Sequence, residues 1–130
     1  MSKREQGFDT GHASKRSLDG TSLRFDLAAE TAALSAVESA QVEGHNAKTL
    51  VKHSDFTVVL VALKAGARLP EHQTEQRVSI HTLSGRVRLR LPSETVELPA
   101  QHLLTLDHAV PHDVEAIEDS AILLTVVRAR

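Results

Sequence analysis

The stretch from residue 77 to residue 91, RVSIHTLSGRVRLRL, decides the fold class. In each half, apolar residues alternate with polar ones, which is the pattern of a strand with one buried face. Ser84 and Gly85 stand between the halves, and this pair is typical of a turn. The stretch therefore predicts two short strands joined by a tight turn.

Further short runs of β-branched and aliphatic residues lie on both sides of this pair of strands. They are separated by turn residues, mostly Gly, Pro, Asp and Ser. The runs are KTLVKH (48–53), FTVVLVAL (56–63), TVEL (95–98), HLLTLD (102–107), HDVEAI (112–117) and ILLTVV (122–127). Strands this short and this evenly spaced predict an all-β, antiparallel sandwich or barrel.

One segment, near residues 26 to 39, predicts a helix. It is dense in strong helix formers, it begins at Asp26 as a plausible N-cap, and Gly44 follows its end. The apolar residues at helical spacing, which would share one face, are Leu27, Leu34 and Val37. We expect this short amphipathic helix to lie against the outside of the β domain or at a subunit contact.

The chain has 130 residues with 41% hydrophobic content, enough for one core of ordinary size. We expect a mobile tail over residues 1 to 24, a helix and linker over 25 to 44, and one β domain over 45 to 130. The tail is expected to be mobile because it has few large apolar groups to offset the cost of ordering it.

Composition excludes several classes of function. There is no cysteine, so disulfides, thiolate metal ligands and thiol redox chemistry are excluded. The net charge of −2 and the aromatic content of 2% argue against nucleic-acid binding, which needs a basic face or a stacking platform. No apolar run is long enough for a signal peptide or a membrane span, so we expect a cytoplasmic protein that does not bind membranes.

Glycines and one histidine in the middle of the chain follow a recognisable spacing. The pattern is Gly66, five residues, His72, one residue, Thr74, and then Val78, six residues, Gly85. It resembles the first motif of the small single-domain bacterial cupins, the RmlC-like jelly-roll proteins. In that family a second histidine stands at the place of Thr74 and a glutamate at the place of Val78.

The closing segment, from Pro99 to Val127, resembles the second cupin motif. His112 falls where the last metal-binding histidine of the family falls, whereas Asp107 and Ala109 replace the usual proline and glycine. The resemblance extends from about Phe56 to Val127. It implies a jelly-roll, or double-stranded β-helix, barrel that holds a metal ion or small ligand between its two sheets.

The resemblance makes His72 and His112 the candidate metal ligands, for iron, manganese, nickel or zinc. A useful site for such an ion needs at least three imidazole or carboxylate ligands, and Thr74 and Gln76 are poor ones. A third ligand could be recruited from His108 or Glu75. The alternative is that the two histidines orient a ligand directly, or serve only as hydrogen-bonded structure.

Alternation along the strands predicts the wall of the cavity. The residues expected to line the pocket are His72, Thr74, Gln76, Val78, Ile80, Thr82, His112 and Val114. This wall is mostly apolar with a few polar groups, which is typical of a small-molecule site. Arg86, Arg88 and Arg90 alternate with apolar residues that claim the interior, so we expect an outward arginine row, solvated or at an interface.

Two functions remain open on the sequence. The first is a small-molecule-binding cupin without a complete metal site. The second is a metal-dependent cupin enzyme of dioxygenase, decarboxylase or isomerase type that uses His72 and His112. The helix face and the arginine-bearing strand suggest a homodimer, as small cupins commonly form.

Overall fold

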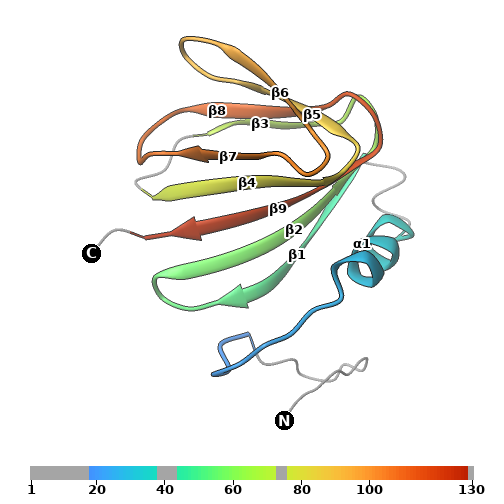
Figure 1. The fold of residues 1–130 in the computed structure, drawn as a ribbon, viewed down its shortest axis with the longest axis vertical. Helices are drawn as coiled ribbons and strands as arrows, with labels where there is room; N and C mark the ends of the chain where they lie inside the picture. The colour runs from blue at the N-terminus through green and yellow to red at the C-terminus, as the bar shows by residue number, and fades with distance from the viewer. Residues whose placement is uncertain (1–17, 38–43, 73–75, 129–130) are drawn as a thin grey trace.

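A computed structural model describes residues 18–37, 44–72 and 76–128, without the side chains of residues 70–72. Two antiparallel sheets and one short helix make up the fold (Figure 1). One sheet has the strand order β1-β2-β9-β4-β7 and the other has the order β3-β8-β5-β6. The elements are α1 (Leu27–Ser35), β1 (His45–Lys52), β2 (Phe56–Leu63), β3 (Arg68–His72), β4 (Arg77–Ser84), β5 (Arg86–Arg90), β6 (Thr95–Pro99), β7 (Leu103–Leu106), β8 (His112–Ala116) and β9 (Ser120–Val127).

The strands form where the sequence alternates. On β4, Val78 and Ile80 are buried while Ser79 and His81 are only half-buried. On β5, Val87 and Leu89 are fully buried between arginines. The turn between β4 and β5 passes the chain from one sheet to the other, so the two strands predicted as neighbours in sequence do not pair with each other.

The main hydrophobic core lies between the two sheets. It joins buried side chains of both, and packing them together removes their apolar surface from water. Its fully or nearly fully buried members are Val61, Leu63, Val78, Ile80, Val87, Leu89, Leu98, Leu106, Val114, Ala116 and Ile122.

Helix α1 packs on the outside of the five-stranded sheet, over β1 and β2 (Figure 1). Asp26 caps it, since its side chain accepts a hydrogen bond from the backbone N–H of Ala29 at 3.1 Å. Leu34 packs there in a second cluster with Leu50, Leu60 and Ala62. The helix was expected to continue to residue 39, but it ends at Ser35, and Val37 lies 42% exposed beyond it.

The structure has a strand, β3, that the alternation of polar and apolar residues does not predict. Pro70 lies within it, and proline is tolerated in sheets at an edge or a bulge. β3 is an edge strand of the four-stranded sheet, and its pairing with β8 is irregular between Leu69 and His72. This position explains how a strand forms around a proline.

The start of the chain is only partly described. Residues 1–17 of the expected mobile tail lie outside the described residues, but Leu18 is held to the end of β1, where its carbonyl accepts a hydrogen bond from Lys52 N–H at 2.8 Å. No helix within the described ranges is long and apolar enough to cross a membrane.

Candidate functional site

The backbone brings the two predicted histidines together. β3 pairs with β8 in the antiparallel sense, and His72 stands directly opposite His112 in the register. Residues directly opposite in such a pair have Cβ atoms about 4.5–5.5 Å apart. The side chain of His72 and the whole of Thr74 lie outside the described part of the structure, so the candidate site is described from the side of His112.

His112 is a buried histidine whose ring orientation is fixed. It is 3% exposed, and its Nδ1 lies 3.0 Å from the carbonyl oxygen of Val110. Because a carbonyl oxygen only accepts, Nδ1 carries the hydrogen in this contact. In the neutral ring, Nε2 is then the nitrogen with the lone pair, the one that can accept a hydrogen bond or bind a metal ion.

Most other residues of the predicted wall are buried on the inner faces of the sheets. Val78, Ile80 and Thr82 are buried on β4, and Val114 is buried on β8, two residues beyond His112. The hydroxyl oxygen of Thr82 is buried without a hydrogen-bond partner among the described residues. These side chains face the interior, and whether they line a ligand cavity stays a prediction.

Gln76 lies at the end of the fold where β4 begins. When the side-chain amide of Gln76 is oriented so that its oxygen faces donors and its nitrogen faces acceptors, the oxygen accepts hydrogen bonds from Nε and Nη2 of Arg128, each at 2.9 Å. Arg128 follows the end of β9, and its backbone N–H donates to the carbonyl oxygen of Asp55 at 3.0 Å. A guanidinium group is therefore held at this end of the sheets.

The described residues do not assemble a transition-metal site. Within residues 18–37, 44–72 and 76–128, no three histidine, aspartate or glutamate side chains gather closely enough to hold an ion. Val78, at the place of the family's glutamate, is buried and apolar. His108 is exposed and its Nδ1 contacts Asp107 at 3.0 Å, while Glu75 lies outside the described residues.

Asp107 is the residue near this end whose acidity is most altered. Its pKa is lowered from the usual 3.8 to about 2, first by the backbone N–H of His108 and then by the side chains of Arg77 and His108. Nε of Arg77 lies 2.8 Å from its carboxylate. Asp107 is therefore negatively charged above about pH 4, and Arg77 beside it compensates that charge.

The arginine row points outward, as its alternation predicts. Arg86, Arg88 and Arg90 lie on the outer face of the four-stranded sheet, where they meet carboxylates from the flanking strands. The acidic partners on those strands are Glu97 on β6 and Asp113 and Glu115 on β8. The hydrogen bond that Nη2 of Arg90 donates to the carboxylate of Glu115, at 2.8 Å, is the main cause that raises the pKa of Arg90 above its usual value.

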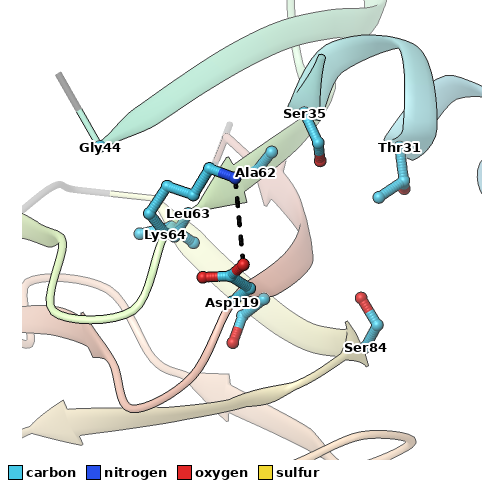
Figure 2. A pocket seen from close by; sticks show the side chains of 9 residues that line it. Thr31, Ser35, Gly44, Ala62, Leu63, Lys64, Ser84 and Asp119 are labelled. Atoms are coloured by element: carbon cyan, nitrogen blue, oxygen red, sulfur yellow. Dashed lines mark ion pairs between the residues drawn. The ribbon is translucent and has the colours of Figure 1, made fainter. Parts of the chain in front are cut away.

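Two hollows occur away from His112, and sequence reasoning found neither. The first, about 110 Å³, lies between α1 and the ends of β2 and β4 (Figure 2). There the ammonium group of Lys64 lies 3.9 Å from the carboxylate of Asp119, so the charges compensate each other. The second, about 360 Å³, lies over β4, β7 and β9. The small polar side chains that line this second hollow are Ser79, Thr105 and Thr125. Alternation along each strand could have placed them on the outer face, but only the order of strands in the sheet shows that they are neighbours.

Comparison with known proteins adds the fold family. The sequence matches no protein-family model and no curated protein. Among solved structures, the chain is similar to a conserved Streptococcus pyogenes protein of unknown function, SPY1581, with TM-score 0.65 and 21% identity, over 73% of this chain and 88% of that one.

Two other solved structures reach 25% identity. One is an RmlC-like cupin protein from Desulfovibrio desulfuricans, with TM-score 0.63 over 72% of this chain and 91% of that one. The other is KdgF from Halomonas sp., with TM-score 0.61 over 67% of this chain and 82% of that one. The architecture described above is thus that of bacterial RmlC-like proteins.

Proposed function

We propose that this chain, a small cupin protein, binds a small molecule between its two sheets, at the end where His72 and His112 stand opposite each other. In this proposal the sheets form the jelly-roll barrel that the resemblance implies. The register of the two histidines is the observation that carries the proposal, since the sequence separates them widely and the fold pairs them.

The chemistry of the site supports ligand binding over a structural role for the histidines alone. His112 is oriented by Val110 through Nδ1, so that Nε2 carries the lone pair of the neutral ring. The buried side chains of the predicted wall on β4 and β8 are apolar, except for Thr82 and His112 itself. An apolar interior with a few oriented polar groups fits a ligand with an apolar body and a hydroxyl or acidic group.

A pair of matched variants tests the role of His112. Asparagine places its amide nitrogen near the position of Nδ1, so His112→Asn keeps a donor for the Val110 carbonyl and loses Nε2. Glutamine reaches the position of Nε2 and loses the Nδ1 donor. We expect His112→Asn to keep most of the stability and to lose ligand binding, whereas His112→Gln loses stability by about 1–3 kcal/mol.

Binding is measured by NMR, as chemical-shift changes of the imidazole groups during titration with small hydroxylated and carboxylate compounds. The changes should concentrate on His72 and His112 and disappear in His72→Ala. Compounds that bind with equal affinity to the wild type and to both His72→Ala and His112→Asn would contradict the proposal.

A metal-dependent enzyme is the second candidate function, and the paired register of the two histidines is the observation that favours it. The test is elemental analysis of protein purified without chelator and without a metal-affinity tag. Stoichiometric iron, manganese, nickel or zinc that is lost in both His72→Ala and His112→Ala would favour this candidate. The two candidate functions also predict opposite effects of pH on affinity. As the pH falls, protons compete with a metal ion for imidazole and weaken its binding, whereas protonated imidazole binds an anion more tightly.

A further inference from the structure

Arg128 differs from the arginines of the strands in the kind of partner that holds it. The arginines of β3, β4 and β5 all contact carboxylates; they are Arg68, Arg77, Arg86, Arg88 and Arg90. The side chain of Arg128 is held by the amide oxygen of Gln76 instead, and no carboxylate in the described part of the chain lies within ion-pair distance of it. An amide oxygen fixes the direction of a guanidinium group but carries no charge to compensate it.

Gln76 and Arg128 both continue the inner face of the five-stranded sheet. The pairing of β4 with β9 runs up to the residues next to these two. Two residues further into each strand, Val78 is buried in the core between the sheets and Val126 packs against that core. Because side chains two residues apart on a strand share a face, Gln76 and Arg128 lie on the inner side, where the apolar core ends.

The two paired histidines lie at the same end of the fold. β3 ends and β8 begins there, with His72 and His112 opposite each other. Figure 1 shows the end of β9 and the starts of β4 and β8 together on the left of the molecule. His72 precedes Gln76 by four residues, at most roughly 14 Å of extended chain. Arg128 is exposed, as a group at the entrance to the interior would be.

The contact with Gln76 uses one edge of the guanidinium group. Nε and Nη2 of Arg128 each lie 2.9 Å from the amide oxygen. The edge formed by Nη1 and Nη2 is the one that can bind both oxygens of a carboxylate at once. The backbone N–H of Arg128 also donates to the carbonyl oxygen of Asp55 at 3.0 Å. Backbone and side chain are thus fixed before any ligand binds, which lowers the cost of ordering them on binding.

We infer that Arg128 binds the acid group of the ligand, and that the ligand is a small monocarboxylic acid whose apolar part lies between the sheets. This inference rests on the proposed function, in which the ligand binds at the end where His72 and His112 are paired. The chain itself supplies the cation, since a guanidinium group is charged at every ordinary pH. One guanidinium group paired with a neutral amide suits a carboxylate better than a phosphate dianion, which needs more donors and more positive charge.

Titrations followed by NMR, with acids and their neutral amides, test the class of ligand. The probes are butanoate, hexanoate and benzoate, each beside the corresponding amide. All are measured at pH 8, well above the ordinary histidine pKa of about 6.5, so that the charge under test is that of the guanidinium group. We expect at least one acid to bind about tenfold or more tightly than its amide.

Replacing Arg128 tests the source of this preference. Arg128→Gln removes the charge and should lower the affinity for the acid by about tenfold or more, while the affinity for the amide changes less than about twofold. The matched control is Arg86→Gln, which makes the same change of charge at the other end of the four-stranded sheet, on its outer face. The control should leave both affinities unchanged.

Gln76→Glu separates ligand binding from a structural role of the contact. The variant places a carboxylate beside Arg128, which then forms an ion pair within the chain. If the contact serves only to hold the end of β9, this stronger partner should leave acid binding unaltered. We expect the affinity for the acid to fall about tenfold, because the charge is compensated, while the unfolding temperature stays the same or rises.

The possible failures of this inference and of the proposed function differ. Equal affinity for acid and amide, or a preference for the acid that survives Arg128→Gln, would overturn the inference and leave small-molecule binding intact. Loss of acid binding in Arg128→Gln but not in His112→Asn would support the role of Arg128 and contradict binding beside the histidines. No binding of any probe by the wild type would reject the inference, and the broader panel of the histidine titrations would then decide the proposed function.

Discussion

Thr82 places a hydroxyl group in the interior with no partner among the described residues. Leaving a buried hydroxyl unpaired costs free energy, whereas valine has nearly the same shape and no such cost. We expect Thr82→Val to raise the free energy of unfolding by about 1 kcal/mol, measured by urea denaturation. A loss of stability would show that the hydroxyl group has a partner, such as an interior water or a bound ligand.

Asp107 makes the stability depend on pH below the usual range of a carboxyl group. Its pKa in the folded state, about 2, lies below its usual value of 3.8. Its contribution is therefore complete above about pH 4 and is lost as the pH falls toward 2. The stability difference between wild type and Asp107→Asn should shrink across this interval.

The direct measurement is an NMR titration of the Asp107 carboxyl carbon. Arg77→Gln removes one of the groups that lower this pKa, and the midpoint should move upward by a smaller amount than the whole shift, since the backbone N–H of His108 remains. A midpoint near 3.8 in the wild type would contradict the electrostatic argument.

At the scale of elements, the turn between β4 and β5 depends on glycine. Gly85 has φ +80°, and a Cβ atom there would overlap the carbonyl oxygen of Asp119 and the side chain of Ser120. Gly66 has φ +87° with open space around it. We expect Gly85→Ala to cost on the order of 4 kcal/mol and Gly66→Ala only about 1–2 kcal/mol, from the left-handed backbone alone.

Thermal and chemical unfolding of the two glycine variants provide the comparison. Gly66→Ala serves as the control, because both positions need a positive φ and only Gly85 has no room for a side chain. Equal losses would mean that the turn can move away from Asp119 and Ser120.

At the scale of the whole molecule, two separate clusters hold the fold together. Ile122 belongs to the core between the sheets, and Leu34 belongs to the cluster under α1. We expect Ile122→Ala to cost about 2–5 kcal/mol, as buried large-to-small changes do, and to lower the protection of all core amides together.

Leu34→Ala should instead release α1 alone. In hydrogen exchange, the amides of residues 27–35 should lose protection while those of β9 retain it, because a helix attached by one small cluster can open locally. A uniform loss of protection over α1 and β9 would show that helix and sheets unfold as one unit.

The sequence by itself determined most strand positions, because the alternation of polar and apolar residues along a strand is a local property of the chain. FTVVLVAL gave the bounds of β2 without error, and the arginines of β5 were correctly assigned to the outside by their buried neighbours Val87 and Leu89. The likeness to RmlC-like cupins also came from local spacing, that of Gly66, His72 and Gly85, and the solved structures bear it out.

Only the tertiary structure decided which distant residues meet. The register that sets His72 against His112, the hollow over β4, β7 and β9, and the strand at Pro70 all depend on the order of strands in the sheets. Alternation tells which side of its own strand a residue occupies but not which strand lies beside it. Pairing is decided by the burial and hydrogen bonding of the whole fold, and the candidate site arises at that level.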